Sequence, residues 1–329
     1  MFQLVKGLVK EKILELLKKK TYVSGEELSR KFNLSRTAVW KHIKALRRKG
    51  YVVEAKPRQG YRLVKTPDLL LPVEIKAELK TKIFGKKIFH FNEVTSTQEV
   101  AKKLATQGFE EGTVVVAEKQ SKGKGRVGRE WVSPLGGVWL SIILKPNILP
   151  HQAQKITLVV AVAVANVIRR LYGLDAKIKW PNDVLIDKKK VCGILVEASG
   201  EVDRLNYMVV GVGVNLNVNP ATVESKLVKT ATSISEILGR EVSKVEFTRE
   251  FLVEFEKLYK LFGSGGFNQI LEEWKKLSET LGCKVKIVSQ NEVFVGEALD
   301  VDEEGFLLVK LPNGFVKKVV SGDVYVRKV

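Results

Sequence analysis

The sequence predicts an α+β chain of three parts: a small helical module with a β-hairpin, a central mixed α/β domain and a C-terminal domain of short strands. Three observations support this prediction. Apolar residues recur at helical spacing in the first part, strand-like and helical segments alternate in the middle, and short strands separated by turns follow Gly282. A chain of 329 residues is long enough for two or three cores. We place the boundaries at residues 1–65, 66–281 and 282–329.

The N-terminal part predicts three helices and a hairpin. Apolar residues at helical spacing mark the first helix: Ile13, Leu16 and Leu17. Ser24 begins a second helix as the first residue of a capping box that Glu27 completes. Ser35 is placed to cap a third helix, which ends at Gly50. A hairpin over residues 51–63 follows.

This order of elements is that of a winged helix-turn-helix, whose recognition helix can enter the major groove of DNA. The polar face of the third helix and the hairpin supply the predicted DNA-binding residues: Ser35, Arg36, Thr37, Trp40, Lys41, Lys44 and Arg58. Further phosphate contacts are expected from Arg47, Arg48 and Arg62. Trp40 either packs against the hairpin or touches DNA. A solvated basic face, or one that binds protein, is the alternative.

The charge is unevenly distributed along the chain. Residues 1–65 contain 18 Lys/Arg and 5 Asp/Glu, so they hold +13 of the formal net charge of +19. A strongly basic module next to a nearly balanced body indicates a polyanionic partner. Together with the order of elements, this favours operator DNA as that partner.

The two cysteines, Cys192 and Cys283, stand in no metal-binding spacing, which indicates a reducing compartment and argues against a structural zinc site. The longest apolar run, residues 156–168, is too short to cross a bilayer. We therefore expect a cytoplasmic protein with no membrane partner.

The central part predicts a sheet interrupted by helices. Strands are expected at residues 87–91, 113–118, 138–144, 176–180, 184–187, 191–198 and 206–215. One helix is expected from about Gln98 and a long buried one over residues 152–172. Residues 233–281 are largely helical by the same pattern. The strands after Gly282 carry equal numbers of acidic and basic residues.

A glycine-rich cationic loop between Ser121 and Trp131 is the most informative segment of the central part. Lys124, Arg126 and Arg129 alternate there with glycines, which suits a loop that closes over phosphate or carboxylate. The segment also fits the dinucleotide-binding pattern GxGxxG, but no helix follows it, because Pro134 would interrupt one. A purely structural turn is the alternative.

No nucleophile motif, catalytic histidine arrangement or P-loop is present. What remains is cationic and glycine-rich: the loop, the block Lys179–Asp183, the cluster Lys188–Lys190 and the segment Gly211–Asn215. Such a site suits nucleotidyl transfer, in which the substrate supplies the nucleophile and the protein supplies position and charge. Taken singly, the second block could be a strand with a turn and the third a solvated hairpin tip.

The motifs in this order resemble the family of bifunctional biotin–protein ligases and biotin operon repressors. They are Ser96-Thr-Gln98, Gly123-Lys-Gly-Arg-Val-Gly-Arg129 with Trp131 and Ser133-Pro134, Lys179-Trp-Pro-Asn-Asp183, Lys190-Val-Cys-Gly-Ile-Leu-Val-Glu197 and Gly211–Asn217. The resemblance covers essentially the whole chain. It implies a winged helix-turn-helix, a central domain like that of class II aminoacyl-tRNA synthetases and biotin ligases, and a C-terminal SH3-like barrel.

The resemblance implies a biotin–[acetyl-CoA-carboxylase] ligase. Biotin and ATP would give biotinyl-5′-AMP, which then acylates a lysine of a biotin carboxyl carrier domain. Lys190 and Arg126 would be the catalytic residues. The biotin-binding set would be Ser96, Thr97, Gln98, Gln120, Gly123, Lys124, Gly125, Arg126, Trp131, Lys190, Gly193, Gly211 and Gly213. The glycines would leave room for the ligand to approach closely.

The nucleotide would be held by a second set: Lys124, Arg126, Arg129, Asn182, Asp183, Lys190 and Asn215. Asp183 would bind Mg²⁺. Biotinyl-5′-AMP would also act as corepressor, because its binding would order the loop and favour a homodimer on operator DNA. The C-terminal barrel would help order the site or meet the carrier.

Two departures from the family pattern stand out. Lys124 replaces the usual arginine of the loop, which keeps the charge but loses the planar fork. Residues 218–232, where the family covers adenine, contain no aromatic residue, so the adenine contacts stay open. Two alternatives remain: a biotin-responsive DNA-binding regulator without catalysis, and a lipoate-type ligase, which would be expected to need a longer apolar slot.

Overall fold

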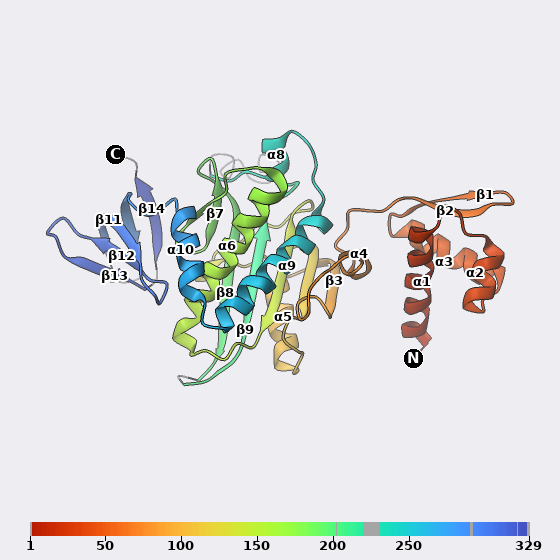
Figure 1. Ribbon diagram of the computed structural model, residues 1–329, viewed down its shortest axis with the longest axis horizontal. Helices are drawn as coiled ribbons and strands as arrows, with labels where there is room; N and C mark the ends of the chain where they lie inside the picture. Colours follow the sequence, from red (N-terminus) through yellow and green to blue (C-terminus); the bar gives the residue numbers. More distant parts are fainter. Residues whose placement is uncertain (1, 202, 220–229, 290–291, 321, 328–329) are drawn as a thin grey trace. The chain divides into compact units, whose positions relative to one another are not determined.

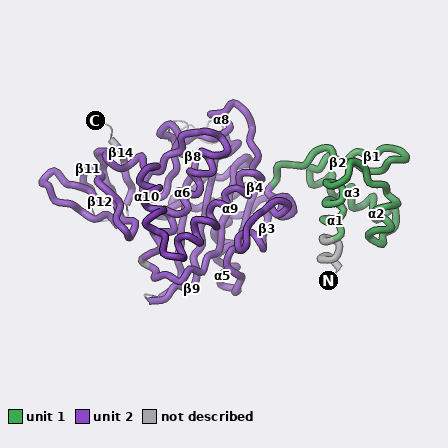
Figure 2. The backbone as a smooth tube through the Cα atoms, in the orientation of Figure 1, with its two compact units in different colours: residues 1–69 green, residues 70–329 purple. Residues whose placement is uncertain are grey.

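The computed structural model describes residues 2–201, 203–219, 230–289, 292–320 and 322–327. Contacts divide the chain into two compact units, residues 1–69 and 70–329 (Figure 2). Residues 220–229, which belong to the segment where adenine contacts were left open, lie outside the described residues. No helix among the described residues is long and apolar enough to cross a membrane.

The first unit contains the predicted three helices and hairpin (Figure 1): α1 (Phe2–Lys19), α2 (Gly25–Phe32), α3 (Arg36–Arg48), β1 (Val52–Lys56) and β2 (Gly60–Lys65). Both predicted caps are present, because Ser24 Oγ accepts from Glu27 N at 3.0 Å and Ser35 Oγ accepts from Ala38 N at 3.1 Å. The predicted helices, their two N-caps and the hairpin of the helix-turn-helix are therefore confirmed.

The outer face of α3 is available for contact. Trp40 is 47% exposed, and the Lys44 ammonium lies 4.9 Å from the centroid of its indole. The side chain therefore stays on the solvent face of the helix. Arg47 differs from the prediction, because its guanidinium donates to the carbonyl of Val53 at 2.9 and 2.6 Å and ties the hairpin to α3.

The second unit is built on a seven-stranded sheet in the order β3-β4-β5-β9-β8-β7-β6. Its strands are β3 (Ile88–Val94), β4 (Val114–Gln120), β5 (Val138–Leu144), β6 (Lys177–Lys179), β7 (Asp183–Ile186), β8 (Lys189–Gly200) and β9 (Leu205–Val214). Only the pair β3–β4 is parallel. The structure agrees with the rejection of the dinucleotide-binding motif, since only a three-residue 3₁₀ turn, η1 (Arg126–Gly128), stands where that motif needs a helix.

Helices cover both faces of the sheet (Figure 1). They are α4 (Pro72–Lys76), α5 (Thr97–Thr106), η2 (Pro150–Gln152), α6 (Ala153–Tyr172), α8 (Ile234–Leu238), α9 (Lys244–Gly263) and α10 (Phe267–Leu277). The large core lies between the sheet and the layer of α6, α9 and α10. A smaller core lies under α5 on the opposite face, where Ala101 packs with Val115, Ile143 and Val209.

The C-terminal strands form a five-stranded antiparallel sheet in the order β13-β12-β11-β10-β14. Its strands are β10 (Lys284–Val288), β11 (Val293–Val301), β12 (Leu307–Lys310), β13 (Val316–Val319) and β14 (Asp323–Arg327). The predicted change from helices to short strands is thus present. This sheet packs within the second unit, since Trp180 Nε1 donates to the carbonyl of Gly305 at 3.1 Å.

Candidate active site

The floor of the site is a flat area on the α5 face of the large sheet. Strand register aligns Trp139, Gly213, Gly193 and Asp183 in one row across β5, β9, β8 and β7. Gly211 lies two residues from Gly213 and so faces the same side. Three positions without side chains therefore meet in the middle of the sheet.

Side chains of the protein itself occupy the space that these glycines leave. A Cβ at Gly213 would lie 2.4 Å from Trp131 Nε1, and one at Gly193 would lie 2.8 Å from Trp131 Cζ3. A Cβ at Gly211 would lie 2.6 Å from Gln98 Oε1. The glycines therefore admit Trp131 and Gln98, and all three also line the cavity. That they leave room for a ligand stays a prediction.

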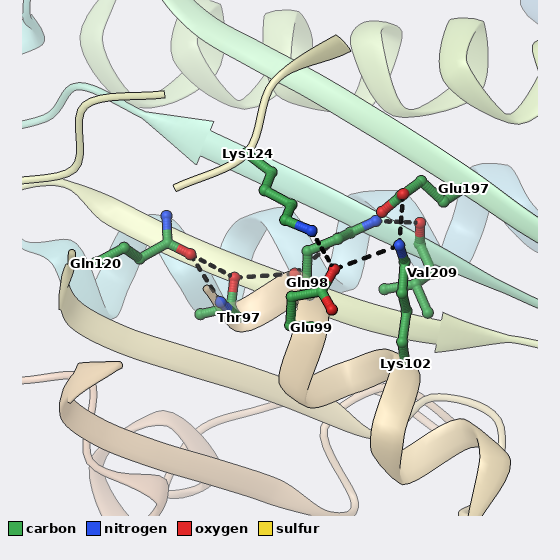
Figure 3. Close-up of polar contacts among 9 residues, drawn as sticks. Thr97, Gln98, Glu99, Lys102, Gln120, Lys124, Glu197 and Val209 are labelled. Carbon is green, nitrogen blue, oxygen red and sulfur yellow. Dashed lines mark hydrogen bonds and ion pairs between the residues drawn. The ribbon is translucent and has the colours of Figure 1, made fainter. Parts of the chain in front are cut away.

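One end of the cavity is a network of buried polar groups (Figure 3). Gln120 Oε1 accepts from Thr97 N at 2.8 Å and from Thr97 Oγ1 at 3.0 Å. Gln98 donates from Nε2 to the carbonyl of Val209 at 3.0 Å, while its Oε1 accepts from Ser141 Oγ at 3.0 Å. The network fixes the orientation of both amides, which a pocket for a polar ring requires.

Three buried polar atoms of residues that line the cavity have no hydrogen-bond partner among the described residues: Ser96 Oγ, Trp131 Nε1 and Asp183 Oδ1, of which only the last has an ion-pair partner, Lys190. Ser96 is the N-cap of α5, yet its hydroxyl makes no capping bond. Buried polar groups are normally satisfied, so the Ser96 hydroxyl is a candidate to meet a ligand, whereas Trp131 Nε1 lies against Gly213.

The charged end of the cavity holds a lysine between a carboxylate and an indole. Lys190 Nζ lies 2.6 Å from Asp183 Oδ1 and 4.9 Å from the centroid of the Trp131 ring. Arg126 Nη1 donates to Asn182 Oδ1 at 3.0 Å. Asn182 in turn donates from Nδ2 to the carbonyl of Ile194 at 2.9 Å, so its amide is a support for Arg126.

The cationic loop is fastened to three different elements. Lys124 Nζ donates to Glu99 Oε1 on α5 at 2.6 Å, and Arg129 Nη1 donates to Asp323 Oδ1 on β14 at 3.1 Å. Arg126 reaches Asn182 in the turn before β7, as described above. Between these anchors Val127 is 69% exposed and has a φ of 54°, a left-handed conformation that β-branched residues rarely adopt.

Burial lowers the pKa of two cations beside the cavity. For Arg126 the loss of hydration dominates, and the charges of Asp323 and Asp183 oppose it. For Lys179 burial again dominates, Asp183 opposes it, and the neighbouring Lys190 adds to the lowering. An anion bound here would raise both pKa values again, because it places a negative charge beside cations that are already removed from water.

Two adjoining cavities meet at this point. The smaller one, of about 140 Å³, is lined by the polar network and Lys190; the larger one, of about 450 Å³, adjoins it at Trp131. Trp131, Asp183, Lys190 and Glu130 line both. The larger one is bounded further by apolar groups and two more lysines: Val132, Pro134, Leu185, Val218, Ala231, Lys179 and Lys188.

Most of the predicted site residues line the smaller cavity: Ser96, Thr97, Gln98, Gln120, Lys124, Gly125, Arg126, Arg129, Trp131, Asn182, Asp183, Lys190, Gly193, Gly211 and Gly213. Gly123 does not line it. A Cβ there would lie 2.2 Å from the carbonyl oxygen of Trp131, so this glycine permits the loop to fold on itself. Asn215 lines the larger cavity and donates from Nδ2 to the carbonyl of Thr232 at 3.1 Å.

Sequence reasoning missed several lining residues: Glu130, Leu140, Ser141, Ile194, Leu195, Val212 and Asp323. Ser141 had a usable signal, because it is the lone hydroxyl in the fully buried strand β5. Asp323 had none, since its contact with Arg129 joins segments 194 residues apart.

Within the described residues no three His, Cys, Asp or Glu side chains gather as metal ligands. Burial raises the pKa of the Cys192 thiol, against the opposing effect of Lys190, so this cysteine beside the site is not a thiolate nucleophile. The arrangement supplies cations, fixed amides and apolar walls. It can position two anionic reactants and neutralise the charge between them.

Comparison with known proteins agrees with this geometry. Residues 90–215 match the biotin/lipoate A/B protein ligase family, residues 9–62 match an HTH domain, and residues 280–327 match the biotin protein ligase C-terminal domain. The bifunctional ligase/repressor BirA of Bacillus subtilis is 40% identical over 304 residues, 92% of this chain and 93% of its own. The chain belongs to the BirA family.

The likeness extends across bacteria and to solved structures. The bifunctional ligase/repressor BirA of Escherichia coli is 28% identical over 317 residues and is matched over 96% of each chain. Among structures, the biotin protein ligase of Aquifex aeolicus in complex with biotin and ATP is 28% identical, with a TM-score of 0.64. That match covers 74% of this chain and all of the other, which confirms the predicted fold of a BirA-family catalytic unit.

Proposed function

We propose that the protein is an ATP-dependent biotin–protein ligase that also represses transcription in response to biotin. The names of its relatives support both activities, and the Aquifex aeolicus structure holds biotin and ATP. A relative from Paracoccus denitrificans, 31% identical over 67% of this chain, is a biotin–[acetyl-CoA-carboxylase] ligase. The acceptor proposed here is accordingly a lysine on the carrier domain of such a carboxylase.

One observation carries the catalytic proposal: Lys190 lines both cavities at the place where they meet. Biotin would occupy the polar, smaller cavity, with its ureido ring on Ser96, Thr97, Gln98 and Gln120. ATP would occupy the larger cavity, whose apolar wall suits a nucleoside and whose lysines suit a triphosphate. The reacting carboxylate and α-phosphate would then both lie against the ammonium of Lys190.

The first step joins these two groups. A carboxylate oxygen of biotin attacks the α-phosphorus of ATP, a P–O bond forms, and the bond to the β-phosphate breaks to release pyrophosphate. Two anions must approach each other, so the protein lowers the barrier by holding positive charge between them. Lys190 and Arg126 are the catalytic residues in this proposal. Lys124, Arg129, Asn182 and Asn215 complete the nucleotide set.

One carboxylate of the site, that of Asp183, is the proposed ligand of Mg²⁺. Asp183 lies at the wall of both cavities, and a single carboxylate together with phosphate oxygens is a donor set that Mg²⁺ accepts. When bound, Mg²⁺ would neutralise phosphate charge and favour the departure of pyrophosphate. Asp183 would hold the metal, and Lys190, whose Nζ lies 2.6 Å from Asp183 Oδ1, would contribute its positive charge beside it.

The second step consumes the mixed anhydride. The amine of the carrier lysine attacks the acyl carbon of biotinyl-5′-AMP, AMP leaves, and a proton is lost from the new amide nitrogen. Water would hydrolyse the same bond, so the cationic loop must cover the intermediate until the carrier arrives. Trp131, on the glycine floor, forms the wall against which the ligand is held.

The regulatory half of the proposal rests on the first unit. α3 presents Arg36, Thr37, Trp40, Lys41 and Lys44 as exposed residues, Ser35 is its N-cap, and Arg58 is an exposed residue of the turn between β1 and β2. Biotinyl-5′-AMP would act as corepressor by favouring a homodimer that presents two such helices to operator DNA. The functional domains are proposed to be residues 1–65, 66–281 and 282–329, in a protein that acts in the cytoplasm.

A direct assay tests the ligase. The purified protein is incubated with biotin, ATP, Mg²⁺ and a carrier domain from the same organism, and the carrier is probed for biotin and digested to find the modified lysine. We expect biotinylation that requires all components. Biotin binding with no modified carrier would instead support the regulator without catalysis, and tighter binding of lipoate than of biotin would support the lipoate-type ligase.

A second assay tests repression. Fluorescence anisotropy with the promoter of the organism's own biotin genes measures the affinity with and without biotin plus ATP. We expect tighter binding when both are present, accompanied by a shift from monomer to dimer in sedimentation. Equal affinity in the two conditions would contradict the regulatory half of the proposal.

A further inference from the structure

The lysine that replaces the usual arginine of the loop has a carboxylate partner outside the loop (Figure 3). Lys124 Nζ lies 2.6 Å from Glu99 Oε1, and Glu99 lies in the first turn of α5. The hydrogen bond from Lys124 is the main reason why the pKa of the Glu99 carboxyl lies below its usual value, although partial burial opposes it. Glu99 is therefore ionised and paired at neutral pH.

The pair continues into a chain of alternating charges. Lys102 Nζ lies 3.4 Å from Glu99 Oε1 and 2.5 Å from Glu197 Oε1 on β8. We call Lys124, Glu99, Lys102 and Glu197 the charge ladder. The charge ladder joins the cationic loop, the helix α5 and the strand β8. Glu99 lies between two lysines and Glu197 beside one, so the two negative charges balance the two positive charges.

The position of Glu99 connects the loop to the polar end of the cavity. Thr97 and Gln98, the two residues before it, line that cavity, and α5 carries all three. Lys124 stands between Gly123 and Gly125, and glycine restricts the backbone least of all residues. Side-chain anchors such as the one to Glu99 therefore limit the movement of this half of the loop.

We propose that Glu99 is a positioning residue that holds the loop over the bound intermediate by fixing Lys124 to α5. This inference rests on the proposed function and adds to it the control of intermediate retention. Glu99 does not line the cavity and touches no reacting group in it. Its effect should appear in the lifetime of the bound adenylate, with little change in the rate at which the adenylate forms.

The exposure of the Lys124–Glu99 pair sets how strongly its loss should change the rate of adenylate release. The side chains of Lys124 and Glu99 are 47% and 45% exposed, and pairs this exposed stabilise a structure only modestly. We expect Glu99→Gln to release biotinyl-5′-AMP about two to five times faster at low salt. The single-turnover rate of adenylate formation should stay within about twofold, since the groups that line the cavity are unchanged.

The experiment uses the full chain loaded with radiolabelled biotinyl-5′-AMP made from biotin and ATP. Release is followed after dilution into excess unlabelled biotin and ATP, at about 0.05 M and about 1 M salt, which differ strongly in screening. We expect the ratio of variant to wild-type release rates to approach one at high salt. Glu93→Gln is the matched control, because Glu93 is 53% exposed and pairs with Lys119 at 3.1 Å.

A double variant separates positioning from a structural effect. In a Lys124→Met background, Glu99→Gln should accelerate release no further, since its partner is already gone. Equal release from wild type and Glu99→Gln at low salt overturns the inference, as does an acceleration that persists in the Lys124→Met background. Failure of the wild-type protein to form any adenylate is a different result, because it overturns the proposed function itself.

Discussion

The indole of Trp131 rests on Gly213, where the position of a Cβ would lie only 2.4 Å from Trp131 Nε1. Gly193 is the register partner of Gly213 on β8 and allows the same ring to lie flat across both strands. Trp139 meets the indole edge-on at a centroid distance of 6.4 Å. Trp131, which lines both cavities, is therefore seated on two glycines that line the smaller one.

Gly213→Ala should displace Trp131 and weaken ligand binding. The added methyl group meets a rigid ring inside a packed sheet, where overpacking typically costs about 1–3 kcal/mol. We expect the KM values for biotin and ATP to rise together by about tenfold or more, measured by initial rates of carrier biotinylation. Gly263→Ala is the control, since a Cβ there meets no atom within 4 Å. A KM for both substrates within twofold of wild type would contradict the role of the glycine floor.

Lys190→Ala should separate chemistry from binding. Removing the charge that meets both anions should slow adenylate synthesis by about 10²- to 10³-fold. Biotin affinity, measured by calorimetry without ATP, should remain measurable because the polar network is untouched. Lys189→Ala serves as the control, since its side chain lines neither cavity. Near-normal adenylate synthesis in Lys190→Ala would refute the role assigned to it.

Local signals in the sequence predicted local structure well. Ser24 and Ser35 cap the helices they were expected to cap, because an N-cap depends on residues only three positions away. The strands of the central sheet follow their apolar runs, and Pro134 correctly argued against a helix after the cationic loop. Ser96, Thr97 and Gln98, which the resemblance and not a local signal singled out, lie together at the cavity because they are consecutive in the chain.

Contacts between distant segments were not predictable in this way. Nothing near Arg129 indicates that Asp323 will meet it, and nothing near Lys124 indicates Glu99. The glycines show the same limit, since a glycine reveals that something lies close but not what lies there. In this chain the neighbour was Trp131, which the resemblance included in the biotin-binding set without showing that Gly193 and Gly213 lie against it.

The exposed face of α3 should divide into base-reading and phosphate-binding residues. Trp40→Ala should lower the affinity for operator DNA about tenfold more than the affinity for scrambled DNA, because it removes an apolar surface from the recognition helix. Lys41→Ala should weaken both by the same factor and reduce the salt slope by about one. Anisotropy titrations over a salt series measure both quantities. A uniform loss in Trp40→Ala would assign that residue to packing alone.

A buried carboxylate should make the second unit sensitive to acid. Glu118 is 3% exposed, and its carboxylate lies 2.5 Å from Lys244 Nζ, accepts from Leu70 N at 2.7 Å and lies 3.0 Å from His90 Nε2. Burial alone would raise the pKa of this carboxyl, but the hydrogen bonds from His90 and Lys244 outweigh it and leave the pKa below the usual value of 4.5. The ionised form is thus the one that stabilises the fold.

Glu118→Gln should therefore destabilise the protein in a pH-dependent manner. A depressed carboxyl pKa adds stability above the pKa of the unfolded chain, and this stability is lost as the pH falls through the folded-state value. At neutral pH we expect a loss of about 3 kcal/mol in the free energy of unfolding, because the variant removes the buried negative charge that contacts Lys244 and His90. Urea denaturation at several pH values measures it, with Glu93→Gln as the exposed control. The difference from wild type should shrink below about pH 4.5, so a constant difference down to strongly acidic pH would show that Glu118 acts through packing and not through its charge.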